Sequence, residues 1–292
     1  MPPTRTTELT MTLVHHRRDW QSVSYLIALP TLVSWQWQQT AVNAAAYGLT
    51  LMLVIGLCCI NHNHAHLPIW RYPILNRITD LWIGLLQGQP VFLFQPAHVD
   101  SNHRHNQSPG DLTRVARHDT GNTLLGYLRF PFQVLPALQR LRRDHLRKCW
   151  HQDRAEFWWI MLQHLALLSL WATLVVLDPF KALIYVALPQ LLGLHFLLAS
   201  NYLQHAHAVA GSRHNHSRNF VGWINWFWFN VGYHTAHHDN ERLHWTELPS
   251  AHAALLPDIR PALIERSVLL YFVRTLFLGQ FIGALRSRQL ID

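Results

Sequence analysis

Histidine is the residue type that most clearly carries chemistry in this sequence. The chain has 22 histidines in 292 residues, and 18 of them lie in two blocks, residues 61–154 and 200–292. Imidazole is the commonest metal ligand in proteins. Within the blocks the histidines form four clusters: His62/His64/His66, His98/His103/His105, His205/His207 and His234/His237/His238. Clustering of this kind predicts a metal site built from several imidazoles.

The spacing within two clusters places imidazoles on one helical face. Residues four apart on an α-helix are neighbours, so His62 and His66 can point at one metal ion. The i, i+3, i+4 spacing of His234, His237 and His238 puts three imidazoles on one face, a costly arrangement without a metal. A single HxxxH pair usually lies on the surface of a helix and has no function. Four clusters in one chain argue against coincidence.

The ligand type leaves the metal open. Eight or more imidazoles indicate two metal ions, since zinc sites usually take four ligands. Imidazole suits iron, copper, nickel and zinc alike. The three cysteines form no CxxC motif, which argues against a cysteine zinc site and a disulfide framework. The paired Glu-x-x-His motifs of soluble di-iron oxygenases are missing.

Four apolar stretches are predicted to cross a membrane: residues 22–37, 41–60, 157–177 and 182–199. The second is twenty uncharged residues long, about what a helix needs to span the hydrocarbon core. Short links at 38–40 and 178–181 join the stretches into two hairpins. We therefore expect an all-α fold, with four transmembrane helices and a cytoplasmic helical cap that holds the histidines. We treat residues 1–292 as a single membrane-embedded domain.

The positive charges give this topology an orientation. Of 24 Lys and Arg residues, only Lys181 lies on the side of the short links. The positive-inside rule then places both termini in the cytoplasm. A pI of about 9.9 would also suit a nucleic-acid-binding protein. The basic residues form no stripe and no known reader motif is present, so nucleic acid is not an expected partner.

The clusters and hairpins together resemble the integral-membrane fatty acid desaturase and hydroxylase superfamily. An HxxxH box, a second histidine box and an HxxHH box are spread over two membrane hairpins in that superfamily. NYLQH (201–205) followed by GYHTAHH (232–238) is similar to its bacterial members, and an Asn-Tyr-x-x-His element is similar to the alkane hydroxylases. The resemblance implies a bacterial inner-membrane location.

The resemblance also implies a ligand set. The metal ligands carried over are His62, His66, His98, His103, His205, His234, His237 and His238. The second box departs from the pattern, because Asn102 stands where the first of the paired histidines is expected. Either His105 reaches in as a ligand, or Asn102 or water fills the position. Around the ligands we expect Asp100, His216 and Asp239, with the two carboxylates placed to orient ligand imidazoles.

By resemblance, the activity is O₂-dependent oxidation of an unactivated C–H bond in a lipid by two iron ions. A fatty acid or acyl-chain desaturase or hydroxylase is the leading hypothesis, with electrons from an external ferredoxin, rubredoxin or cytochrome. A carotenoid ketolase or hydroxylase and a fatty acid oxidative decarboxylase are alternatives in the same superfamily. A histidine-rich metal transporter is a third class. Transporters need ionisable groups near the bilayer midplane, whereas these clusters lie outside it.

Overall fold

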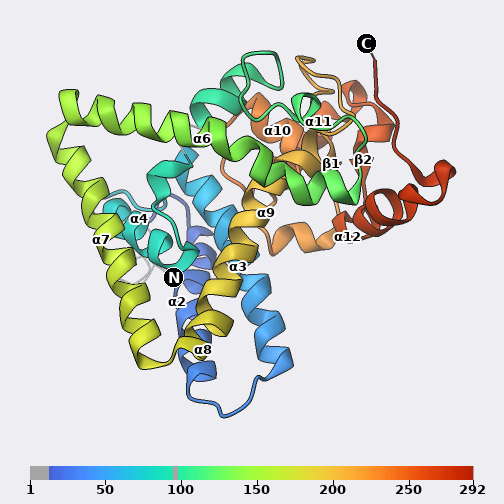
Figure 1. Cartoon of the computed structure of the whole chain (residues 1–292). Coiled ribbons are helices and arrows are strands. Elements are labelled where there is room, and N and C mark those ends of the chain that lie inside the picture. Colours follow the sequence, from blue (N-terminus) through green and yellow to red (C-terminus); the bar gives the residue numbers. More distant parts are fainter. Residues whose placement is uncertain (1–12, 95–97, 292) are drawn as a thin grey trace, which may run out of the picture. The chain divides into compact units, whose positions relative to one another are not determined.

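The computed structural model describes residues 13–94 and 98–291, and Figure 1 shows their secondary structure. About 69% of the chain is helical, with almost no strands, which confirms the all-α prediction. Within the described residues, the strands are β1 (Asn219–Phe220) and β2 (Ile264–Glu265), which pair in parallel. The chain divides into two compact units. We call residues 1–93 and 146–196 the hairpin unit and residues 94–145 and 197–292 the histidine unit. The single domain stays a prediction.

The hairpin unit is built from long apolar helices. In sequence order they are α2 (Asp19–Trp37), α3 (Ala44–His66), α4 (Pro73–Gln87), α7 (Arg154–Leu177), α8 (Pro179–Lys181) and a π-helical turn (Ala182–Ala187) that leads into α9 (Leu188–His205). Within this unit α2 and α3 pack side by side as one hairpin, and α7 turns back into α8 as the second (Figure 1). The chain therefore makes the two predicted helical hairpins.

Short polar side chains set the ends of these helices. Asn43 caps α3 by accepting a hydrogen bond from the Ala46 amide at 3.0 Å, so the helix begins three residues later than the predicted span. It continues to His66, six residues beyond the prediction, and Leu67 then precedes a proline, a position that disfavours the α conformation. The α7–α8 turn uses Asp178, whose carboxylate accepts from two following amides. Because of the longer α3, the first histidine box is helical throughout.

The tips of the two hairpins are tied together by hydrogen bonds. The Lys181 ammonium donates to the Trp37 carbonyl at 2.6 Å, and the Tyr47 hydroxyl donates to the Ile184 carbonyl at 3.1 Å. Farther along, α3 and α9 approach closely at Gly193, where a Cβ would lie 2.5 Å from a Val54 methyl group. A larger residue at position 193 would push these two helices apart.

Three helical segments of the described chain are long and apolar enough to cross a membrane. They are Ala44–His66, Arg154–Leu177 and Pro179–His205, with mean hydropathies of 1.9, 2.0 and 1.9. These segments contain most of the second predicted stretch and all of the third and fourth. The first predicted stretch is helical as part of α2 but does not reach the same apolarity. Four spans and a cytoplasmic cap therefore stay a prediction, while the membrane-protein character is supported.

The histidine unit combines shorter helices with long connections. Its main elements are a π-helical turn (His98–His103), most of α6 (Leu124–Gln152), the end of α9, α10 (His234–Asp239), α11 (Leu248–Leu255) and α12 (Val268–Tyr271). The other short helical turns of the described residues are Val91–Leu93, Val115–Arg117, Trp223–Trp226, Leu256–Asp258, Pro261–Leu263, Phe272–Phe277, Leu278–Gln280 and Gly283–Leu285. A buried cluster around Tyr202, Phe130 and Tyr271 forms the core of this unit and packs α6 against α9.

Candidate metal centre

The histidine unit gathers six imidazoles into two groups. In the first group, Nε2 of His103 lies 3.0 Å from Nε2 of His98 and 3.0 Å from Nε2 of His237. In the second group, Nε2 of His234 lies 3.1 Å from Nε2 of both His205 and His238. The two groups adjoin, because the His103 and His238 rings stack with centroids 4.1 Å apart. Six of the predicted ligands therefore present the same ring nitrogen to one another.

The nitrogen separations fit ligands that share an ion. Nε2 atoms bound about 2.1 Å from one metal at angles between a right angle and a tetrahedral angle lie about 3.0–3.4 Å apart. The observed 3.0–3.1 Å fall in this range. The ligand atoms of His205, His234 and His238 all lie within 4.8 Å of one another, so these three rings could hold an ion by themselves. The site residues therefore fit a metal in each group.

The HxxHH motif serves both groups from one short helix. His234 is the first residue of α10, and His234 and His238 belong to the second group while His237 belongs to the first. Thr235 anchors the helix: its amide donates to Asn219 Oδ1 at 3.0 Å and its hydroxyl contacts Ser217 Oγ at 2.9 Å. These groups are fully buried, so the start of α10 is fixed against the segment that leads into β1.

The tautomer of His205 is fixed by the backbone. His205 is the last residue of α9, and its Nδ1 lies 2.8 Å from the carbonyl oxygen of His216. A carbonyl only accepts hydrogen bonds, so Nδ1 carries the proton and Nε2 keeps its lone pair. This arrangement of a metal-binding imidazole, with its other nitrogen bonded to a carbonyl, is common in metalloproteins.

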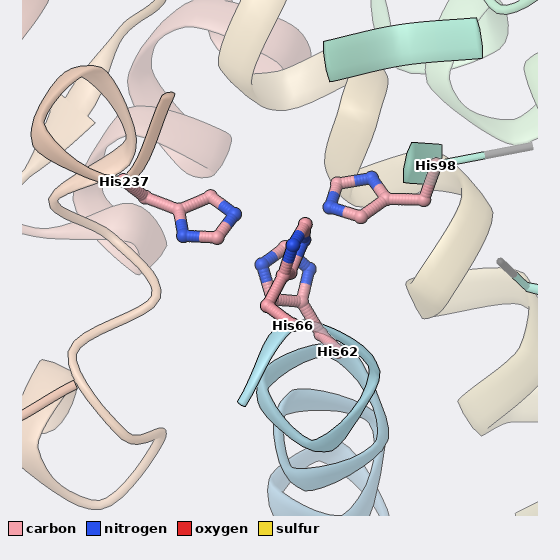
Figure 2. A group of neighbouring side chains, drawn as sticks. All are labelled: His62, His66, His98 and His237. Atoms are coloured by element: carbon pink, nitrogen blue, oxygen red, sulfur yellow. The ribbon is translucent and has the colours of Figure 1, made fainter. Parts of the chain in front are cut away.

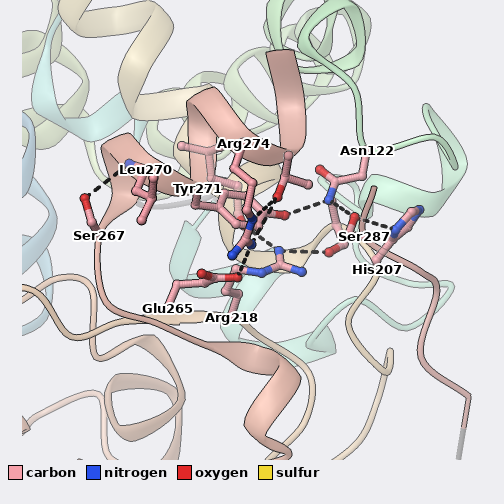
Figure 3. A network of polar contacts seen from close by, with 12 residues as sticks. Asn122, His207, Arg218, Glu265, Ser267, Leu270, Tyr271, Arg274 and Ser287 are labelled. Atoms are coloured by element: carbon pink, nitrogen blue, oxygen red, sulfur yellow. Dashed lines mark hydrogen bonds and ion pairs between the residues drawn. The ribbon is translucent and has the colours of Figure 1, made fainter. Parts of the chain in front are cut away.

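Arg218 holds the end of α9 that carries His205. Its guanidinium donates to the carbonyls of Leu203 and Ala206 at 3.0 and 3.1 Å, and its charge complements the negative end of the helix dipole. The guanidinium carbon also lies 4.5 Å from the centre of the Tyr271 ring. Figure 3 shows Arg218 beside Tyr271, with the Arg274–Glu265 ion pair nearby. Arg218 thus positions a predicted ligand through the backbone.

The structure describes both residues considered for the open position of the second histidine box, Asn102 and His105. Asn102 is buried, and its amide group donates to Asp111 at 3.0 Å and to Asn201 at 3.2 Å. The His105 ring packs against Gly110, where an added Cβ would lie 2.7 Å from Nδ1. None of the ring contacts found among the described residues joins His105 to the two groups. The structure brings His98 and His103 together and leaves the role of His105 a prediction.

Of the two predicted orienting carboxylates, Asp239 is the one whose side chain the structure describes. The side chain of Asp100 lies outside the described part of the structure. Asp239 contacts Arg213 at 3.7 Å and His214 at 3.9 Å. Glu241 instead lies 3.4 Å from Nδ1 of His103. Sequence analysis missed Glu241, which lies two residues beyond the end of α10 and so outside its helical spacing.

His216 lies directly beside the second group. It is buried, and its ring centroid is 4.9 Å from that of His238 and 6.1 Å from that of His205. Burial, together with the neighbouring His205 ring, lowers the pKa of His216 to about 3. Burial and four neighbouring imidazoles also hold the pKa of His238 well below its ordinary value. Both rings are therefore neutral at physiological pH, which is the form that binds metal.

The first histidine box belongs to the hairpin unit. Figure 2 shows His62 and His66 at the end of α3, and their ring centroids are 5.4 Å apart. The prediction that they share one helical face is confirmed. Figure 2 also shows His98 and His237 of the histidine unit, whose rings are nearly parallel with centroids 6.0 Å apart. The role of His62 and His66 as ligands stays a prediction.

Comparison with known families decides the assignment. Residues 35–269 match the fatty acid desaturase family. The chain belongs to the fatty acid desaturase family. The match includes every histidine of the two groups together with His62 and His66. Membership in this desaturase family makes the protein a membrane oxidoreductase of the desaturase and hydroxylase type, with a lipid substrate. Neither the curated proteins nor the solved structures contained a match to the chain.

Proposed function

We propose that this chain is an O₂-dependent membrane oxidase that uses two iron ions to oxidise an unactivated C–H bond of an acyl chain. The observation that carries the proposal is the pair of adjoining imidazole groups, with Nε2 atoms facing one another at 3.0–3.1 Å. Two groups suit two ions, and the family membership favours iron among the metals that imidazole accepts. Desaturation and hydroxylation begin with the same hydrogen abstraction.

The protein residues have separate roles in this proposal. His98, His103 and His237 would hold one ion, and the second group would hold the other. The family resemblance adds His62 and His66 as further ligands. When bound, the iron pair supplies O₂ activation and hydrogen abstraction. The backbone carbonyl of His216 and the Glu241 carboxylate orient imidazoles, so that Nε2 faces inward. Burial of His62, His205, His234 and His237 limits the access of bulk water to their donor atoms.

An apolar cavity in the hairpin unit supports a lipid substrate. The cavity has a volume of about 450 Å³, and its lining includes Leu29, Val33, Val54, Leu86 and Leu170. Val54 also belongs to α3, eight residues before His62, which is about 12 Å along a helix. A chain of methylene groups could be bound against such a surface by the hydrophobic effect. Electrons are expected from a separate carrier protein of ferredoxin, rubredoxin or cytochrome type.

The proposed topology has both termini in the cytoplasm, which for a bacterial protein means the inner side of the inner membrane. It is supported by the single basic residue, Lys181, at the hairpin tips. Reporter tags fused to both termini should be inaccessible from outside sealed cells, whereas a tag inserted beside Lys181 should be accessible. An accessible C-terminal tag would contradict the two-hairpin topology.

Lipid analysis of expressing cells tests the proposed activity. Cells that produce the wild-type chain with a suitable electron donor should accumulate lipids with an added double bond or hydroxyl group. Mass spectrometry separates these outcomes, because desaturation removes two hydrogens and hydroxylation adds one oxygen. The change should require O₂ and be missing from cells with an empty vector. Unchanged lipids under aerobic conditions, with folded protein in the membrane, would argue against the proposal.

A further inference from the structure

The second imidazole group has three donors and a fourth histidine beside it. His205, His234 and His238 converge through Nε2, whereas Asn102 occupies the box position where another histidine is expected. The Asn102 amide nitrogen donates to Asp111 and Asn201, and its Oδ1 makes no hydrogen bond within the described residues. Carbonyl oxygen is in any case a ligand better suited to magnesium, calcium or manganese than to iron. The second group therefore has three imidazole donors.

His216 has the tautomer of a metal ligand. Its Nδ1 lies 3.1 Å from the carbonyl oxygens of both Ser212 and Arg213. Since carbonyls only accept, Nδ1 carries the proton and the lone pair resides on Nε2. His205 is fixed in the same way, by the carbonyl of His216 itself. Both rings thus present Nε2 lone pairs, and they stack with an interplanar angle of 26°.

The Nε2 atom of His216 is buried and makes no hydrogen bond within residues 13–94 and 98–291. An unsatisfied buried acceptor destabilises the fold, so its retention needs a partner that the polypeptide does not supply. The segment that carries it is well anchored: the Arg218 amide donates to the Gln204 carbonyl at 2.6 Å, and the Val209 amide donates to the Asn215 carbonyl at 2.8 Å. The position of the ring is therefore set by the fold.

We infer that His216 is a direct ligand of the second metal position, as a fourth imidazole beside His205, His234 and His238. This inference rests on the proposed function, because it needs an ion in the second group. The competing partner for Nε2 is water, since His205 and His216 also line a cavity of about 180 Å³. A histidine that only bonds water would not affect metal binding directly.

Metal content and a thiolate probe test this inference. The variant His216→Ala keeps the backbone carbonyl that orients His205, and purified protein should hold about one iron per chain where wild type holds about two. His214→Ala is the matched control from the same segment, since its ring contacts Asp239 and Asp258, and it should keep about two. Unchanged iron in His216→Ala would overturn the inference and leave the proposed function standing. A wild-type chain with no iron would overturn both.

A second variant reports direct coordination even if His216→Ala is poorly stable. Cobalt-loaded His216→Cys should gain a thiolate-to-cobalt charge-transfer band, because a thiolate at this position would reach the ion. Cobalt-loaded His214→Cys should lack the band. A cobalt-loaded His216→Cys protein without the band would show that residue 216 does not reach the metal and would overturn the inference.

Discussion

Replacing His237 by Ala is expected to abolish lipid oxidation and to lower iron from about two ions per chain to about one. His237 supplies an Nε2 atom 3.0 Å from that of His103, and its loss opens a position that no neighbouring ring is placed to fill. Mutation of a residue that only orients a ligand typically lowers metal affinity or activity by about 10–100-fold. Loss of a ligand itself should therefore lower activity by at least about 100-fold. Iron analysis of purified protein and mass spectrometry of cellular lipids measure the two effects.

The neighbouring changes His234→Ala and His238→Ala should act on the other ion. Both residues belong to the second group, so activity should again be lost while the first group keeps its iron. His15→Ala is the control, because His15 is exposed and far in sequence from every histidine cluster. Full turnover and unchanged iron after the loss of His237 would contradict the assignment of these residues as ligands.

Replacing Arg218 by Met should destabilise the protein by about 3 kcal/mol, because hydrogen bonds to a charged donor contribute about 1.5–3 kcal/mol each and two carbonyls lose their partner. The α9 terminus should then fray, and His205 with it. We expect the melting temperature of the purified protein to fall by about 6–12 °C. Bound iron should fall as well.

Arg288→Met is the matched control, since Arg288 is exposed and the same substitution there should change stability by less than about 0.5 kcal/mol. If Arg218→Met had the same melting temperature as the control and kept its iron, Arg218 would not position His205. A lowered melting temperature with fully retained iron would separate a purely structural role from the positioning role.

Periodicity and spacing in the sequence were sufficient to predict the helices and the shared faces of the histidines. The helical positions of His62, His66 and His234–His238 follow from i, i+3 and i+4 spacing, which is a local property of the chain. Helix ends were less predictable, since α3 runs six residues past the apolar stretch. The polar residues after the stretch remain helical until Leu67, which precedes a proline and so disfavours the α conformation. Hydropathy reports burial in lipid and does not report where a helix ends.

Contacts between distant segments could not be predicted from one sequence. The approach of Glu241 to His103, of Asp111 to Asn102 and of His216 to His238 depends on loops whose paths have no periodic signal. Asp239 was placed beside the ligands on sequence proximity alone, and the fold turns it toward Arg213 and His214. Arg218 gave no signal in the sequence, because a basic residue in a polar segment is ordinarily exposed.

The iron content of the purified wild-type chain tests the central claim most directly. The protein should be produced in iron-supplied cells, purified in detergent and analysed for all first-row transition metals together with protein concentration. Two adjoining imidazole groups predict about two iron ions per chain. One zinc ion per chain and no iron would contradict the account.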